Sequence, residues 1–277
     1  MSESLTDETG DRRSFEPDIS TEGRYVVFSS EATDLIPSDM NNRADVFLFD
    51  CGVEKIVPPS IRRISLSNLG AEGDGESRFP IFSGNTRFIA FATTATNFGP
   101  DLVTEFDVYV YDRDPDMNGV LDDSGGLVVL MSQSSMGVPG NGSSSTPNLS
   151  FDGRYVYFVS DATNLIPNDT NQLFSFDLFV HDRDPDGDGN FFNTAGVTTR
   201  ISLDSNGNEI PTGITAERPA VSYSGRYVTF STPANNVVPG DTNGLNDIFL
   251  VDRDPDGDGD FTNVPQTVRL ISGGLGG

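Results

Sequence analysis

Short runs of alternating apolar and polar residues, separated by Gly, Pro, Asn and Asp, follow one another along the whole chain. The runs are rich in Val, Ile, Phe and Tyr, and their period of two residues predicts β-strands and not helices. The 29 glycines and 17 prolines suit many short strands joined by tight turns. The chain is therefore predicted to be all-β.

One block of sequence occurs four times, which indicates a repeat architecture. Its copies align without a gap and begin at prolines that are 63, 67 and 72 residues apart: PDISTEGRYVVFSS from Pro17, PIFSGNTRFIAFAT from Pro80, PNLSFDGRYVYFVS from Pro147 and PAVSYSGRYVTFST from Pro219. Each copy is followed by a block such as DVFLFD and then by a short strand such as RRISLS. Four strands per repeat are typical of a propeller blade.

The predicted fold is thus a β-propeller of four four-stranded antiparallel blades. It forms either a closed four-bladed ring or half of a larger ring made by pairing of chains, unless the chain is part of a longer protein. The expected organisation is an N-terminal extension, one propeller domain and a Gly-rich tail, over residues 1–14, 15–272 and 273–277. The repeats cover about residues 15–67, 68–133, 134–204 and 205–272.

The repeated block also resembles a known family. The pattern P-x-x-S-x-D/E-G-R-Y-V-x-F-x-S, which runs from Pro147 to Ser160, is similar to the TolB-like, WD-type propeller repeat of bacterial envelope and secreted proteins. The resemblance covers nearly the whole chain and implies the propeller fold. It leaves the function open, because such blades occur in binding platforms, in peptidase gating domains and in surface proteins.

The first turn of the repeat carries a glycine in three copies. Gly23, Gly153 and Gly225 would supply the positive φ of a tight hairpin. Thr86 takes this place in the second repeat, so that turn is expected to be distorted or of another type.

The net charge of −25 comes from 42 acidic and 17 basic residues. Such a surface repels nucleic acid and anionic lipid, so cations are the expected partners. No apolar run is long enough to cross a bilayer, and direct membrane insertion is not expected. The start, MSESLTDETG, lacks the features of a signal peptide. The protein is therefore either cytosolic or exported with a signal that this sequence lacks.

Acidic residues recur in the loop between the second and third strands of the repeats. The first and fourth repeats have D-x-N-x-x-x-D, the third reaches its last Asp two residues later, and the second has a looser version. Asp and Asn can cap turns through their own backbone, but recurrence favours Ca²⁺, which takes roughly six to eight oxygen ligands. The candidate ligands are Asp39, Asn41, Asp45, Asp101, Glu105, Asp107, Asp169, Asn171, Asp177, Asp241, Asn243 and Asp247.

A denser acidic run follows the third strand of repeats two, three and four. The third and fourth copies match the first half of the D-x-D-x-D-G calcium loop, and the second has Asn in it and a further Asp at the ninth position. No copy has the Glu that closes an EF-hand loop, so backbone, water or a neighbouring strand must complete the site. The first repeat has FDCGVEKIVPPS and is expected to lack it. The candidates are Asp114, Asp116, Asn118, Asp122, Asp184, Asp186, Asp188, Asp254, Asp256 and Asp258.

Charge also favours a bound cation. Residues 241–260 carry a net charge of −6, and a compact fold without a counter-ion would press like charges together. Disorder of the run is the alternative. Mg²⁺ suits such a loop less well because it prefers a strict octahedron. One His and one Cys cannot form a tetrahedral Zn²⁺ site.

No catalytic group stands out from the repeats. The single histidine, His181, is equivalent to Phe49, Tyr111 and Val251, so a partly buried structural residue is expected and a Ser-His-Asp triad is not. An active-site carboxylate pair should be a singular feature, yet nearly every acidic cluster recurs. The lone Cys51 excludes an intrachain disulfide and is expected to be buried.

One arginine leads the second strand of every repeat. Pairing with the repeated aspartates is expected, and a ring that binds anions in a central channel is the alternative. These residues are Arg24, Arg87, Arg154 and Arg226.

The sequence therefore favours a calcium-stabilised, extracellular, cell-surface or periplasmic propeller that acts as a non-catalytic binding or assembly module. Its expected partner is a surface protein or glycan, or another copy of itself. The alternative is a secreted, glycosidase-like hydrolase or an accessory propeller of a peptidase. Sites with incomplete ligand sets fill at extracellular Ca²⁺ concentrations of about 10⁻⁴ to 10⁻³ M, which is the reason for placing the protein outside the cytosol.

Overall fold

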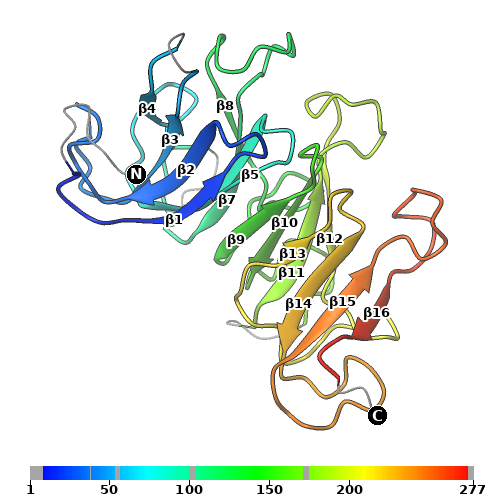
Figure 1. Ribbon diagram of the computed structural model, residues 1–277. Coiled ribbons are helices and arrows are strands. Elements are labelled where there is room, and N and C mark those ends of the chain that lie inside the picture. The colour runs from blue at the N-terminus through cyan, green and yellow to red at the C-terminus, as the bar shows by residue number, and fades with distance from the viewer. Residues whose placement is uncertain (1–8, 38, 54–56, 100–103, 171–174, 274–277) are drawn as a thin grey trace. The chain divides into compact units, whose positions relative to one another are not determined.

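The computed structural model describes residues 9–37, 39–53, 57–99, 104–170 and 175–273. Sixteen strands form four antiparallel four-stranded sheets, and in each sheet the strands lie side by side in chain order (Figure 1). The described ranges contain no helix, and accordingly none that could span a membrane. The prediction of an all-β fold with four four-stranded propeller-type blades is confirmed.

Each blade consists of consecutive strands. Those of the first two blades are β1 Ser14–Ile19, β2 Tyr25–Ser30, β3 Asp45–Asp50, β4 Ser60–Arg63, β5 Ser77–Phe82, β6 Phe88–Thr93, β7 Asp107–Asp112 and β8 Leu127–Leu130. Those of the last two are β9 Ser144–Leu149, β10 Tyr155–Ser160, β11 Asp177–Asp182, β12 Val197–Arg200, β13 Ala220–Val221, β14 Tyr227–Thr232, β15 Asp247–Asp252 and β16 Thr267–Leu270.

In the second and third blades the middle strands are covered on both faces. Every residue of β6, β7, β10 and β11 is buried. The fourth strand is short, and β12 alternates between exposed and buried residues as a half-covered edge should. The loops at the ends of the buried strands therefore have rigid supports.

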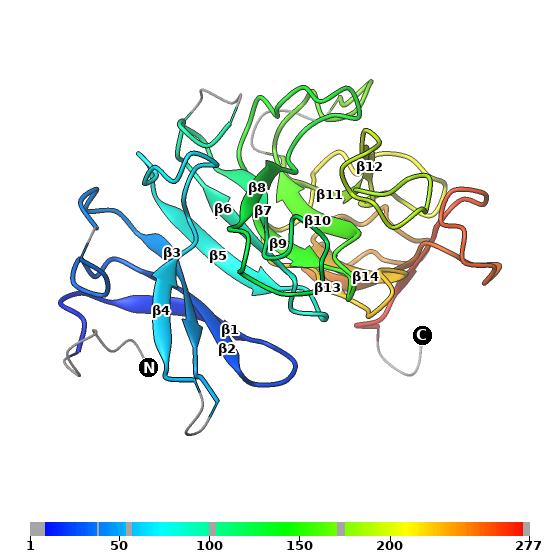
Figure 2. The ribbon, with the colours of Figure 1, turned by 90° about the horizontal axis from the view of Figure 1, so that it is seen from above.

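The chain divides into two compact units, residues 1–131 and 132–277, with two blades in each. In the first unit, strand β5 lies against β1, β2 and β3 (Figure 2), and the shared core contains Ile89, Phe91 and Tyr109. In the second unit the core contains Tyr157 and Phe249. Each unit thus buries the faces of its two blades against one another.

The expectation for the Thr86 turn is wrong, because Thr86 adopts the same turn as the glycines. Its φ is 67°, against 75° for Gly23, and its N–H donates to the Ser83 carbonyl at 2.9 Å. The Thr86 hydroxyl donates to Oε2 of Glu22 in the neighbouring blade, also at 2.9 Å. A tertiary contact therefore accompanies a conformation that a β-branched residue seldom takes.

Every blade carries the expected arginine–aspartate pair between the start of its second strand and the end of its third. In the first blade, Arg24 Nε and Nη2 lie 2.8 and 2.7 Å from the two oxygens of Asp50. The other three pairs have the same two-bonded geometry and consist of Arg87–Asp112, Arg154–Asp182 and Arg226–Asp252. These arginines are pairing residues, as their recurrence predicts.

We expect Gly225→Ala to destabilise the chain more than Gly23→Ala. Both glycines have a positive φ, so each substitution introduces backbone strain of about 1 kcal/mol. A Cβ at Gly225 would lie 2.9 Å from Tyr155 Cδ2, whereas a Cβ at Gly23 meets nothing within 4 Å. Urea denaturation should give a loss of about 2–3 kcal/mol for Gly225→Ala. Equal losses of unfolding free energy for the two variants would contradict close packing of Tyr155 against Gly225.

Candidate metal sites

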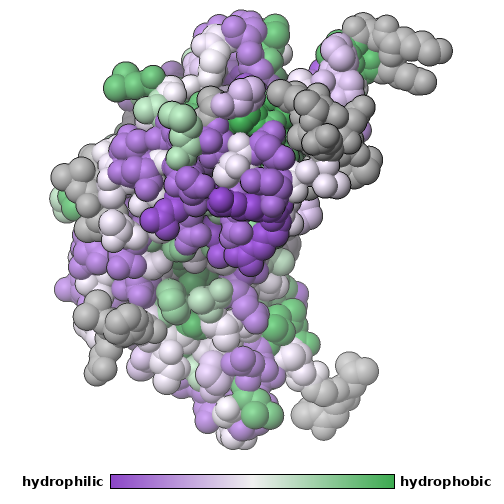
Figure 3. Space-filling model, turned by 90° about the vertical axis from the view of Figure 1, so that its left-hand side faces the viewer, coloured by the Kyte–Doolittle hydropathy of each residue, from purple (hydrophilic) through white to green (hydrophobic). Residues whose placement is uncertain are grey.

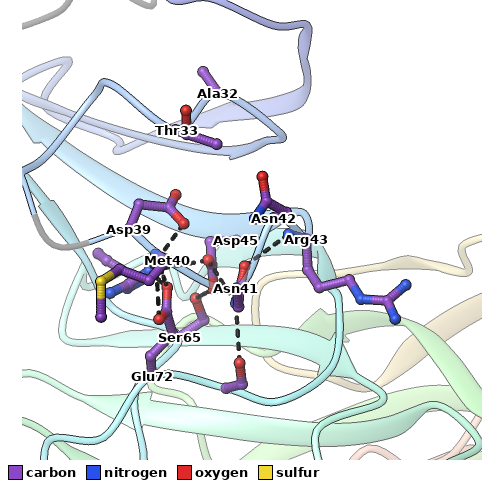
Figure 4. Close-up of polar contacts among 12 residues, drawn as sticks. Ala32, Thr33, Asp39, Met40, Asn41, Asn42, Arg43, Asp45, Ser65 and Glu72 are labelled. Atoms are coloured by element: carbon purple, nitrogen blue, oxygen red, sulfur yellow. Dashed lines mark hydrogen bonds and ion pairs between the residues drawn. The ribbon is translucent and has the colours of Figure 1, made fainter.

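An acidic pocket lies beside the first blade, where predicted ligands from the β2–β3 loop meet a glutamate from the loop after β4. Carboxylate oxygens of Asp39, Asp45 and Glu72 lie within 4.8 Å of one another. Figure 4 shows these side chains and Asn41 pointing toward one another, while Arg43 extends away. Local folding thus brings together the three side chains of the D-x-N-x-x-x-D motif.

Hydrogen bonds hold the pocket's ligands in place. Ser65 Oγ donates to Asp45 Oδ1 at 2.6 Å, and Asn41 Nδ2 donates to Asp45 Oδ2 at 3.2 Å. The Met40 N–H donates to Glu72 Oε1 at 3.0 Å. Asn41 Oδ1 also accepts the Arg43 amide at 2.7 Å, so turn capping and convergence of carboxylate oxygens occur in the same loop.

A buried arginine enters the same pocket. Arg63, the last residue of β4, forms ion pairs with Glu72, with Asp45 at 3.1 Å and with Asp39 at 3.6 Å. One positive charge thus faces three carboxylates, which leaves two negative charges uncompensated when all three are ionised.

Asp39 is the least satisfied of these groups. Both of its carboxylate oxygens are buried and have no hydrogen-bond partner. Burial, followed by repulsion from Asp45, raises its pKa to about 6 in spite of Arg63. A divalent cation would remove this conflict because it would supply ligand bonds and opposite charge together.

The third blade repeats this pocket. Carboxylate oxygens of Asp169, Asp177 and Glu209 lie within 4.8 Å of one another. Arg200 occupies the place of Arg63, with Nη2 lying 2.8 Å from Asp169 and Nη1 lying 3.0 Å from Glu209. Burial raises the pKa of Asp169. The predicted ligand Asn171 lies outside the described residues.

The fourth blade has the acidic ligands without the arginine. Asp241 and Asp247 are both buried, and Asp241 Oδ2 has no hydrogen-bond partner. Asp247 accepts bonds from Ser272 at 2.5 Å and from Asn243 at 2.8 Å, which together lower its pKa. Leu270 aligns with Arg63 by strand register, so this pocket lacks the counterpart of Arg63.

The second blade gives the weakest version of the pocket. Asp107 is buried at the start of β7, whereas Glu105 is exposed. Asp101 lies outside the described residues. Leu130 takes the place of the arginine.

The D-x-D-x-D-G runs form tight loops after β11 and β15. Oxygens of Asp184, Asp186 and Asp188 lie within 4.8 Å of one another, as do those of Asp254, Asp256 and Asp258. The first aspartate of each loop also organises its backbone: Asp254 accepts the amides of residues 258 and 259 at 3.1 and 3.3 Å. Desolvation and then the neighbouring aspartates raise the pKa values of the central residues, Asp186 and Asp256.

The second-blade loop keeps this form, but one predicted ligand points elsewhere. Asp114 accepts the Asn118 and Gly119 amides at 3.0 and 3.1 Å, and Asn118 Nδ2 donates to Asp116 at 3.0 Å. Asp122, expected at the ninth ligand position, instead pairs with Arg113 at 2.6 Å and with Arg62. The arginines attract this carboxylate more strongly than the acidic loop can.

The sequence reasoning missed Glu72, Glu209 and the two pocket arginines. A signal was present, because Arg63 and Glu72 are nine residues apart and Arg200 and Glu209 have the same spacing. The reasoning also missed the arginine of the DRDP runs, whose guanidinium is buried under the acidic loop. These residues are Arg113, Arg183 and Arg253.

The chain has one histidine and one cysteine, and both were expected to be buried. His181 is buried, its Nδ1 lies 2.8 Å from Thr198 Oγ1, and burial lowers its pKa to about 4, as suits a structural residue. The expectation for Cys51 is wrong, since Cys51 is exposed. It follows the last residue of β3 and so lies in the turn outside the sheet.

Comparison with solved structures finds similarity to TolB-like propellers. TolB from Acinetobacter baumannii is 15% identical, with a TM-score of 0.46, over 95% of this chain and 43% of that one. A putative TolB from Agrobacterium tumefaciens is 16% identical, with a TM-score of 0.48, over 95% of this chain and 63% of that one. The tricorn protease is 14% identical, with a TM-score of 0.43, over 92% of this chain and 22% of that one.

This chain therefore spans less than two thirds of the length of each of these structures. No family model matches the sequence, and no curated protein matches it. At such identities and TM-scores the similarity concerns fold and carries no conclusion about function.

We expect Asp39→Asn to stabilise the chelator-treated protein at pH 7.5 by at most about 3 kcal/mol, since it removes a carboxylate whose pKa is raised from 3.8 to about 6. The folded state binds the Asp39 proton more tightly than the unfolded state, so this advantage should disappear as the pH falls from about 6 to about 4.

Urea denaturation of variant and wild type across this range provides the measurement. His181 titrates in the opposite sense over an overlapping range, because its lowered pKa destabilises the fold as the pH falls. Both proteins contain His181, so its contribution cancels when their free energies of unfolding are subtracted. Asp34→Asn, at an exposed carboxylate, is the control for the loss of one negative charge. An advantage of Asp39→Asn that does not vary with pH would contradict a raised pKa.

Proposed function

We propose that the chain is a calcium-stabilised β-propeller module that binds a macromolecule outside the cytosol. The observation that carries the metal proposal is the convergence of three aspartates in each of two loops, with carboxylate oxygens within 4.8 Å of one another. Alternate positions of one tight loop supply these oxygens, as in the first half of a calcium loop.

The buried pockets add independent support. Asp39 and Asp241 have buried carboxylate oxygens without a hydrogen-bond partner, an arrangement that costs free energy unless another group satisfies it. Arg63 compensates part of the charge in the first blade, whereas the fourth blade has Leu270 at that position. We therefore expect the fourth-blade pocket to depend most on a cation.

The chemistry of the ligand sets favours Ca²⁺ over other ions. Carboxylate oxygens converge in the pockets, and a hydroxyl oxygen lies beside them, as Ser272 does beside Asp247. These are hard ligands in an irregular arrangement, which suits the larger Ca²⁺ better than the octahedral Mg²⁺. Backbone carbonyls and water would complete each set.

The proposed binding role follows from how the metal loops are held. They emerge from strands such as β11 and β15, whose ends are fixed by the arginine–aspartate pairs. Loops on a rigid support commonly carry binding residues. Figure 3 shows strongly hydrophilic residues gathered in one area of the face it draws, with hydrophobic residues in small separate patches. A polar surface protein, a glycan or a second copy suits such a face.

Asp186→Asn combined with Asp256→Asn should remove bound Ca²⁺ without harming the metal-free fold. Both side chains are exposed, and the backbone amides of their loops are bonded to Asp184 and Asp254 instead. Isothermal titration calorimetry should show two fewer ions per chain, while the melting temperature in EDTA should not fall.

The matched control combines Asp34→Asn with Asp204→Asn, two aspartates outside the acidic clusters. It removes the same charge and should leave the stoichiometry intact. Equal Ca²⁺ binding by both double variants would show that general negative charge, and not the loops, attracts the ion.

Removal of Ca²⁺ from the wild-type chain should lower its melting temperature by about 10 °C or more, because several ions bind only the folded state. Differential scanning calorimetry at 2 mM Ca²⁺ and in EDTA, at equal ionic strength, measures the shift. The same concentration of Mg²⁺ is the control and should restore little of it. A melting temperature that EDTA does not change would contradict the calcium proposal.

A further inference from the structure

Two equivalent grooves lie between paired blades, one in each unit, and they differ in how a buried arginine is neutralised. In the first unit, Arg113 is fully buried and lies over the Tyr25 ring at 4.0 Å. Asp122 accepts its Nη2 at 2.6 Å and also pairs with Arg62 from β4. A carboxylate therefore closes this groove, which has a volume of about 300 Å³.

In the second unit the equivalent arginine forms no ion pair with a described carboxylate. Arg253 is 6% exposed and lies over the rings of Tyr155 and Phe261 at 4.5 and 4.7 Å. Its Nη1 donates to the Tyr157 hydroxyl and to the Gly225 carbonyl, and it takes part in none of the ion pairs between described residues. Thr262 stands at the position of Asp122.

The groove beside Arg253 is correspondingly open. Thr199 replaces Arg62 at the same strand register, and the cavity has a volume of about 590 Å³. Arg253 lines it together with apolar side chains from β12, from the loop after it and from the loop before β16. These side chains are Val197, Ile201, Leu203, Phe261 and Pro265.

The chemistry of this cavity defines a ligand class. The Arg113–Asp122 pair shows that a carboxylate fits against this arginine. Asp182 also lines the cavity, but Arg154 binds both of its oxygens, so among the described residues no carboxylate pairs with the buried Arg253 guanidinium. The walls favour an apolar body next to that carboxylate. A multiply charged anion such as phosphate suits the cavity less, because the chain carries a net charge of −25.

We propose that this cavity binds a carboxylate carried on an apolar group, with the ligand carboxylate at Arg253 in the place that Asp122 takes in the first unit. Arg253 donates hydrogen bonds to the carboxylate, and Phe261 with Val197 packs against the apolar body. The ligand thus completes a charge pair that the first unit makes from its own side chains.

Titration of the full-length chain with 3-phenylpropionate tests this proposal, with 3-phenylpropionamide as the uncharged control. Backbone amide chemical shifts of residues that line the cavity should move on addition of the acid, and its affinity should exceed that of the amide by about tenfold. N-acetyl-leucyl-phenylalanine binding more tightly than 3-phenylpropionate would identify a peptide C-terminus as the source of the carboxylate, and weaker binding would identify a free acid.

Thr262→Asp should block the site, because it restores the carboxylate that the first unit supplies, whereas Thr262→Asn has the same shape without the charge. Thr262 is exposed, so both variants should fold. The acid should bind about tenfold more weakly to the Asp variant than to the Asn variant. Equal binding of acid and amide by the wild-type chain, shifts away from the cavity, or no binding of either compound would overturn the proposal.

Discussion

Opposite charges that meet at the ends of the buried strands determine the rest of this structure. In each blade the guanidinium at the start of the second strand forms two hydrogen bonds to the aspartate at the end of the third, as Arg24 does to Asp50. Two-point bonding of this kind fixes direction as well as distance. In the second, third and fourth blades the acidic loop begins directly after that aspartate, so the pair sets the point from which the loop leaves the sheet.

The remaining charges differ from blade to blade, and this difference defines the candidate sites. Arg63 and Arg200 enter the pockets of the first and third blades, while Leu270 leaves the fourth without a cation of its own. In the grooves the imbalance is reversed: Arg113 has Asp122, but Arg253 has no carboxylate. A few substitutions at equivalent positions, such as Leu270 for Arg63 and Thr262 for Asp122, thus change the charge balance of otherwise equivalent pockets.

The sequence predicted the blades well because strand period, turn residues and repetition all indicated the same fold. The local spacing of the aspartates also predicted that they converge in the loops of Asp184 and Asp254, while metal binding by them stays a prediction. The sequence reasoning missed Arg63 and Glu72, which come to the pocket from the last strand of the blade and from the loop after that strand. It also assigned Asp122 as a metal ligand of the acidic loop, whereas Arg62 of β4 and Arg113, the residue after β7, bind this carboxylate. Contacts between elements distant in sequence were what local spacing could not show.

The most direct test of the account is a crystal structure grown with Ca²⁺, with anomalous scattering data collected to locate the ions. The account predicts anomalous peaks in the loops of Asp184 and Asp254 and in the pocket of Asp241, each with oxygen atoms at about 2.3–2.6 Å. Well-ordered loops without anomalous peaks at these places would contradict it, because the carboxylates would then be satisfied by the protein and its water alone.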